Sequence, residues 1–159
     1  MDGQDAWGVF VLLVVSGFLG WQGYRAWKRP REMRALANRV GMDYLDDDLP
    51  NSLTLDRTSL ANVSAVWHVL NALKNGARIV VFDCRIGTGK GSWRQTVIAV
   101  ESDKEIQQAL AFNPGFTVER SGSWQLIFEP RESLTGPPSL IPIEELEPHI
   151  ENVESVLKN

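Results

Sequence analysis

The chain has 159 residues, a formal net charge of -4, and 43% hydrophobic against 23% charged residues. This length accommodates one domain of ordinary size and excludes most multi-domain enzymes, while the composition excludes a disordered chain. The one cysteine, Cys84, excludes an internal disulfide framework and zinc sites that need two or more thiolates. We also expect no metal site and no cofactor.

A short acidic tail, residues 1–5, precedes an unbroken run of uncharged residues from 6 to 24. As a helix, this run would span about 28 Å, close to the hydrocarbon core of a bilayer at about 30 Å. The acidic start and the basic, aromatic end disfavour a cleaved signal peptide. We therefore predict a transmembrane helix over residues 6–27. Its predicted membrane-interface residues are Trp7, Trp21, Tyr24, Arg25, Trp27, Lys28, Arg29 and Arg31.

Basic residues cluster at positions 25–41, directly after the predicted span. Because such clusters stay on the cytoplasmic side, we expect a single-pass protein of the inner membrane with its N-terminus outside and its C-terminal domain in the cytoplasm. The lipid bilayer would be its first partner. Ser16 and Gly20 have the spacing that lets two membrane helices approach closely, which favours self-association through that face.

A basic juxtamembrane helix is predicted over residues 28–42, with its regular part at about 31–40 and Gly41 as the residue that ends it. Its apolar face comprises Met33, Leu36, Ala37 and Val40. The acidic segment 46–50 lacks the glycine and the final glutamate of a calcium loop, so it is interpreted as a solvated turn.

Asn75-Gly76 lies between two apolar runs within residues 66–86 and predicts a hairpin turn with positive backbone angles. In the second strand, alternate residues should face opposite sides of the sheet. One side would carry Val80, Phe82, Cys84 and Ile86, and the other Ile79, Val81, Asp83 and Arg85. The glycine-rich segment 87–92 then leads to a third strand at 93–101, which completes an antiparallel meander.

Residues 103–112 have the spacing of a short helix, and two strands flank the tight turn at 121–123. A proline-rich connector leads to a C-terminal helix, in which Pro142 suits the first position and Pro148 predicts a kink or a restart. The expected fold class is therefore α+β: an N-terminal single transmembrane helix followed by a small antiparallel-sheet domain, residues 43–159, with flanking helices.

The glycine-rich loop is a tentative ligand-binding site, formed by Gly87, Gly89, Lys90 and Gly91. Its spacing differs from a P-loop and from a kinase loop, so a connector between strands is the alternative. Arg85 and Arg94 with Trp93 surround the same loop, but the acidic domain lacks the broad basic field of nucleic-acid binders. We expect no nucleic acid as a partner.

Asp83 is the carboxylate within an apolar strand, and the expected explanation is a cross-strand ion pair with a neighbour such as Arg94. Cys84 could in principle act as a nucleophile with His68 or His149 as its base. Because Cys84 aligns with apolar residues, it is instead interpreted as a small buried side chain. No catalytic residue is predicted.

The run 80–100, with a preceding helix that ends in LANRVGMDY, resembles a set of uncharacterised bacterial proteins with an N-terminal membrane anchor. The resemblance extends over about residues 31–130, and Cys84 stands where those proteins usually have tyrosine. The matching positions are Phe82, Asp83, Arg85, Gln95, Thr96 and Val97. This resemblance implies the anchored architecture but no activity, cofactor or catalytic residue.

The resulting functional hypothesis is a single-pass membrane protein that presents a non-catalytic cytoplasmic binding or accessory domain to an unknown protein partner. The alternative is a small membrane-tethered enzyme or phosphate-ligand binder that uses the loop 87–92, since glycine-rich backbone can form an anion-binding nest.

Overall fold

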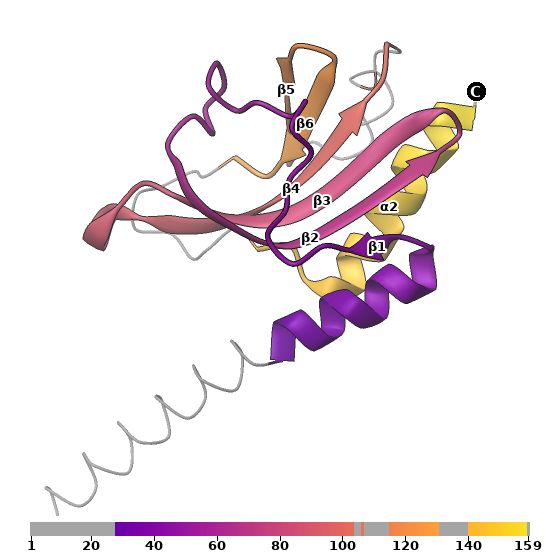
Figure 1. Ribbon diagram of the computed structural model, residues 1–159, viewed down its shortest axis with the longest axis horizontal. Coiled ribbons are helices and arrows are strands. Elements are labelled where there is room, and N and C mark those ends of the chain that lie inside the picture. The colour runs from indigo at the N-terminus through magenta and orange to yellow at the C-terminus, as the bar shows by residue number, and fades with distance from the viewer. Residues whose placement is uncertain (1–27, 104–105, 107–114, 131–139, 159) are drawn as a thin grey trace, which may run out of the picture.

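The computed structural model describes residues 28–103, 106, 115–130 and 140–158, and every structural statement below refers to these residues. An N-terminal helix occupies residues 28–40 of the described chain (Figure 1). The other elements are β1 Asp43–Tyr44, β2 Val63–Lys74, β3 Ala77–Ile86, the 3-10 turn η1 Gly89–Gly91, β4 Trp93–Glu101, β5 Thr117–Ser121, β6 Trp124–Phe128 and α2 Ile143–Lys158.

The strands form one antiparallel sheet in the order β1-β2-β3-β4-β6-β5. The predicted turn between β2 and β3 is confirmed, since Asn75 and Gly76 have φ values of +52° and +80°. The predicted meander is also confirmed, because β3 pairs with β2 on one side and with β4 on the other. The last hairpin joins the sheet through its second strand, β6, so that β5 lies at the edge.

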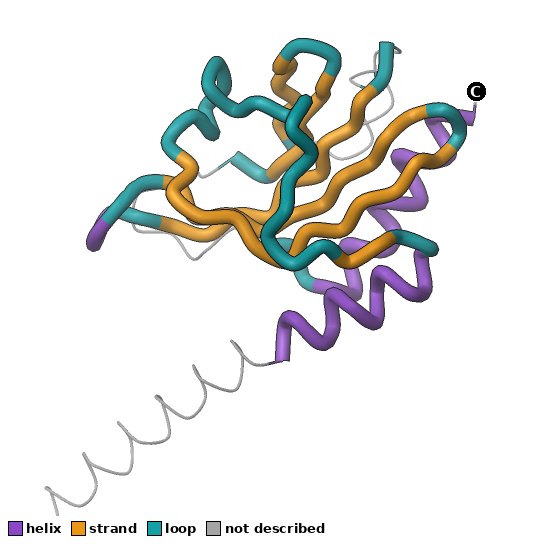
Figure 2. The backbone as a smooth tube through the Cα atoms, viewed as in Figure 1, coloured by secondary structure: helices purple, strands orange, loops and turns teal. Residues whose placement is uncertain are grey.

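Two different coverings pack on the sheet, as Figures 1 and 2 show. The N-terminal helix and α2 cover one side, and the long connection between β1 and β2 covers the other. The strand alternation supplies an apolar face to each covering: Ile79 and Val81 face the helices, while Val80 and Phe82 face the connection. The predicted division of β3 into two faces is therefore confirmed.

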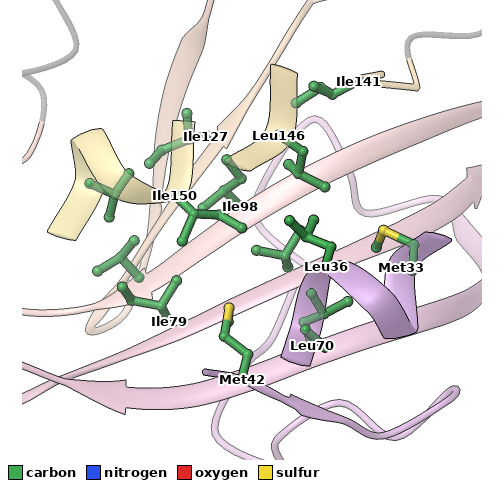
Figure 3. Close-up of a cluster of buried hydrophobic side chains, with 14 of the residues drawn as sticks. Met33, Leu36, Met42, Leu70, Ile79, Ile98, Ile127, Ile141, Leu146 and Ile150 are labelled. Carbon is green, nitrogen blue, oxygen red and sulfur yellow. The ribbon is translucent and has the colours of Figure 1, made fainter. Parts of the chain in front are cut away.

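The helix-side core is built from residues that recur at helical spacing on both helices (Figure 3). The N-terminal helix contributes Met33 and Leu36, and α2 contributes Leu146 and Ile150, all of which are fully buried. At about 25 cal/mol per Å² of buried apolar surface, such side chains stabilise the fold by roughly 1.5–3 kcal/mol each. The predicted apolar face of the first helix is thus confirmed.

The N-terminal helix ends at the predicted residue through a Schellman motif. Gly41 has φ +66°, and the amide of Met42 donates a hydrogen bond of 2.8 Å to the carbonyl of Ala37. Glycine adopts this left-handed conformation without a steric penalty from Cβ. Met42 itself is buried, which directs the chain back towards the sheet.

Of the predicted kink or restart at Pro148, the restart is wrong, because α2 is one helix from Ile143 to Lys158 with Pro148 inside it. The kink stays a prediction. Proline lacks the amide that would bond to the carbonyl of Glu144 four residues earlier. Both residues are exposed, so water can satisfy that carbonyl. Packing of the buried face of α2 against the sheet offsets the remaining cost.

None of the helices in the described part of the chain combines the length and the apolarity that crossing a bilayer requires. The described helices are amphipathic; in the first, Arg34 is exposed opposite the buried Leu36. The predicted fold class, with its transmembrane helix, and the predicted single-pass location in the inner membrane are corrected accordingly: the described residues form a six-stranded antiparallel sheet with two helices.

Several predicted features lie outside the described residues. These are the tail 1–5, the span 6–27 with its Ser16 and Gly20 face, and most of the helix at 103–112. From the last of these, Ile106 is described, and its side chain is fully buried in the helix-side core.

Candidate functional site

A buried carboxylate, Asp83 on β3, lies at the centre of a polar cluster between the sheet and the helices. Its side chain is 0% exposed. Arg29 donates to both of its oxygens, from Nε to Oδ2 at 2.7 Å and from Nη2 to Oδ1 at 3.0 Å. The guanidinium and the carboxylate thus meet in a fork, the strongest geometry available to such a pair.

Thr96 on β4 lies directly opposite Asp83 in the sheet register. Its hydroxyl donates to Asp83 Oδ1 at 2.6 Å and accepts from the amide of Ile141 at 3.1 Å. Arg29 also donates from Nη1 to the carbonyl of Ile141 at 3.0 Å. The cluster therefore ties the start of the N-terminal helix, two central strands and the segment before α2 to one carboxylate.

Burial by itself would raise the pKa of Asp83, because it penalises the charged form. Hydrogen bonds from His68, Arg29 and Thr96, together with the positive charge of Arg29, outweigh that effect and hold the pKa below its ordinary value. Asp83 is therefore a permanent anion at neutral pH. A group so firmly ionised and so fully paired serves as a structural acceptor, because it neither releases nor takes up a proton near pH 7.

His68 reaches Asp83 from a bulge in β2. Its Nδ1 lies 3.1 Å from Asp83 Oδ2, and its φ is +58°. Between the paired positions Trp67 and Leu70, two residues of β2 oppose one residue of β3. A residue other than glycine in this left-handed conformation costs on the order of 1–3 kcal/mol, so the surrounding contacts must impose it. The bulge turns the imidazole towards the carboxylate.

Next to the buried cluster, an exposed basic surface lies on the helix side of the sheet. Arg85 and Arg94 are directly opposite each other across β3 and β4, and both are exposed. Their guanidinium carbons lie 6.0 and 5.5 Å from the ring centroid of the half-buried Trp67. We call these three residues, Trp67, Arg85 and Arg94, the Trp67 patch.

This arrangement overturns two sequence-based expectations. Arg94 does not pair with Asp83, because the register places Arg94 opposite Arg85. Trp93 does not accompany the arginines, because adjacent residues of a strand face opposite sides and Trp93 packs on the far core. The ring that does accompany them, Trp67, comes from β2.

The glycine-rich loop takes the form of a turn at the tip of the β3–β4 hairpin. Gly87 and Gly89 have φ values of +77° and +65°, and η1 follows at Gly89–Gly91. The positive φ angles explain why glycine occupies positions 87 and 89. An added Cβ at Gly89 or Gly91 would meet no atom within 4 Å, so steric crowding requires glycine at neither position. Lys90 is exposed at the tip.

The remaining reactive side chains do not assemble into a catalytic group among the described residues. Cys84 is buried on the face opposite Asp83, and burial, with the nearby charge of Asp83, raises the pKa of its thiol to about 12. The prediction of a buried cysteine is confirmed. The ring of His149 packs edge-on against the ring of Phe116, with 4.8 Å between the two centroids. Within the described ranges, no three His, Cys, Asp or Glu side chains gather as metal ligands would.

Of the predicted membrane-interface residues, three are described. Lys28 forms an exposed pair with Glu32 at 2.9 Å, and Arg31 is exposed. Arg29 is directed inward to Asp83, with its side chain 15% exposed. The others, Trp7, Trp21, Tyr24, Arg25 and Trp27, lie outside the described residues.

Comparison of the chain with protein-family models, with curated proteins and with solved structures finds no match. The resemblance to anchored bacterial proteins therefore stays a prediction, and the functional argument depends on the geometry of the chain itself.

Proposed function

We propose that this domain is a non-catalytic binding module that recognises an anionic partner through the Trp67 patch. The observation that carries the proposal is the direct opposition of two exposed arginines, Arg85 and Arg94, across neighbouring strands. Like charges at such positions destabilise a sheet by a few tenths to about 1 kcal/mol. A bound anion between them would remove that repulsion.

The described part of the chain supplies no counter-ion to the Trp67 patch, which supports the proposal. Among the described residues, the ion pairs involve other basic side chains, and no carboxylate lies within 4.0 Å of the Arg85 or Arg94 guanidinium. Contact with Trp67 contributes about 0.5–1 kcal/mol per exposed cation and restrains both side chains over one ring. The cations are thus held in place while their N–H donors stay available.

The state of the nearby polar groups favours binding over catalysis. Asp83 is engaged by Arg29, His68 and Thr96, and the thiol of Cys84 is buried and protonated at neutral pH. A general base or nucleophile needs a reactive atom open to the substrate. Neither side chain offers one, whereas the Trp67 patch offers two exposed charges.

Titration of the full-length chain with an acidic hexapeptide of glutamates, followed by NMR of the arginine Nε–H groups, tests this function. We expect saturable shifts of the Arg85 and Arg94 signals. Because a hydrogen bond to a charged group contributes about 1.5–3 kcal/mol, Arg85→Gln and Arg94→Gln should each weaken binding about ten-fold or more.

Arg120→Gln is the matched control, since Arg120 is an exposed arginine on the edge strand β5. It should leave the affinity unchanged. If Arg120→Gln weakens binding as much as Arg85→Gln does, the attraction between the peptide and the chain is non-specific. A complete lack of saturable binding by the hexapeptide, and also by a peptide that contains phosphoserine, would refute the proposed function.

A further inference from the structure

We infer that the anion is a phosphate monoester carried by an extended polypeptide segment, which adds to the open edge of β2 and places its phosphate on the Trp67 patch. This inference rests on the proposed function and specifies the partner of the same surface. Two separate features of the described residues carry it: the charge of the patch and the unpaired stretch of β2.

The charge of the patch matches a dianion. Arg85 and Arg94 supply two positive charges, and Lys90 lies at the tip of the same hairpin. A phosphate monoester carries about -1.5 to -2 charges at pH 7, whereas a carboxylate carries -1. One phosphate group can therefore neutralise both guanidiniums at once, and a single carboxylate cannot.

The donors of the patch also match a phosphate. Among the described residues, neither the Arg85 nor the Arg94 side chain makes a hydrogen bond or an ion pair, and their ordered contacts are those with the Trp67 ring. Each guanidinium keeps a planar fork of N–H donors, which suits the oxygens of phosphate. Because both guanidiniums lie near the Trp67 ring, their N–H donors can together bind the three terminal oxygens of one phosphate group.

The open edge of β2 indicates a polypeptide as the carrier. β1 pairs only with Leu70 and Asn71, and beyond it the backbone of Val69 bonds to Leu45 and Asp46. From Val63 to Trp67, no described strand lies on the outer side of β2. An unpaired edge is a template for an added strand.

The position of Trp67 connects the two features. It belongs to the unpaired stretch of β2, and its side chain lies on the same face of the sheet as Arg85 and Arg94. In a strand added beside β2, every second side chain would project to that face. A phosphorylated side chain at such a position is directed to the patch while the backbone of the segment pairs with β2.

Three peptides of about seven residues, a usual strand length, test the inference against the full-length chain by isothermal titration calorimetry. They differ only at the central residue, which is phosphoserine, glutamate or serine. Because the phosphate gains at least one further charge-assisted bond, we expect the phosphoserine peptide to bind about ten-fold or more tightly than the glutamate peptide. Arg85→Gln and Arg94→Gln should remove this preference, and Arg120→Gln should retain it.

Two further phosphoserine peptides test strand addition without altering the protein. In each peptide every second backbone amide is N-methylated, and the two peptides differ in which set of alternate amides carries the methyl groups. The amides of a strand point alternately to either side, so only one of the two sets points to β2. The peptide methylated on that set should bind about ten-fold more weakly, and the other peptide should keep its affinity. Free phosphoserine should bind more weakly than the unmethylated peptide.

The outcomes separate this inference from the proposed function. Equal affinity for the glutamate and phosphoserine peptides would overturn the phosphate assignment and leave the anion-binding function intact. Equal affinity for free phosphoserine and the peptide, or indifference to both methylation patterns, would overturn strand addition. Failure of every anionic peptide to bind would refute the proposed function together with the inference.

Discussion

Replacing Arg29 by methionine tests whether the buried ion pair holds the helices on the sheet. Methionine keeps much of the apolar stem but leaves the carboxylate of Asp83, which is 0% exposed, without its cation. Removing one partner of a buried pair costs about 3–5 kcal/mol, because the remaining charge has lost both water and counter-ion. With an m-value of about 2 kcal/mol per molar urea, the unfolding midpoint should fall by about 1.5–2.5 M.

The assay is urea unfolding at pH 7, followed by circular dichroism. Arg39→Met is the matched control, since Arg39 lies on the same helix and pairs with Glu147 at 2.9 Å, with side chains 50% and 32% exposed. Exposed pairs of this kind contribute about 0–1 kcal/mol. If Arg29→Met shifts the midpoint no more than Arg39→Met does, the reasoning about the buried pair is refuted.

The pH dependence of the same variant provides a second, independent check. The pKa of Asp83 is held below its ordinary value in the folded chain, so its contribution to stability is complete above about pH 4 and is lost as the pH falls through the folded pKa. Without Arg29, burial would raise that pKa, and protonation would relieve the buried charge. The difference in stability between the wild type and Arg29→Met should therefore narrow from pH 7 to about pH 3. A constant difference would contradict this account.

A double variant, Arg29→Met with Asp83→Leu, completes the thermodynamic cycle. Replacing both members of a buried pair by apolar groups is often neutral or stabilising, whereas breaking the pair is costly. The double variant should therefore lose less stability than the sum of the two single variants, by about 1–3 kcal/mol. Additive losses would show that Arg29 and Asp83 act independently.

Three further predictions concern backbone conformation and the cysteine. His68→Gly should be about 1 kcal/mol more stable than His68→Ala, because both lose the bond to Asp83 but only glycine adopts φ +58° without strain; equal stabilities in urea would contradict this. Gly89→Ala should cost about 1 kcal/mol, whereas Gly91→Ala in the same turn should be nearly neutral, since Gly89 has φ +65° and Gly91 has no positive φ. Cys84 should react with a disulfide reagent at pH 8 only after urea unfolds the chain, because its thiol is buried with a pKa of about 12; reaction of the folded chain at the rate of a free thiol would disprove this.

The local pattern of the sequence predicted most of the sheet. Alternation along β3 assigned Val80 and Phe82 to one core and Ile79 and Val81 to the other, and Asn75-Gly76 marked the turn before it. These features depend on residues close in the chain, where period and turn chemistry are directly visible. The end of the first helix at Gly41 was predictable for the same reason.

The polar cluster could not be predicted in this way, since its members are distant in sequence. Arg29 lies 54 residues before Asp83, and in the sequence it is one of several basic residues that follow an apolar run. The available signal was Asp83 itself: a carboxylate that alternates with Ile79 and Val81 must be buried and needs a cation. The sequence does not say which of its many arginines supplies that cation.

The Trp67 patch was missed because of register. The length of the turn between β3 and β4 decides whether Arg94 lies opposite Asp83 or Arg85, and glycine-rich turns allow several lengths. The bulge at His68 also shifts β2 by one residue, and histidine at this position carries no mark of a left-handed backbone. Tertiary packing fixed both features.

The attachment of Arg29 to both Asp83 and Ile141 has a consequence for the order in which the chain can fold during synthesis. Ile141 lies 112 residues after Arg29, so this contact can form only when nearly all of the described chain has left the ribosome. Until then, Ile79, Val81 and Ile98 lack the cover of α2 and expose an apolar face. Nascent chains that pause before residue 141 should therefore be the form most prone to aggregate or to recruit chaperones.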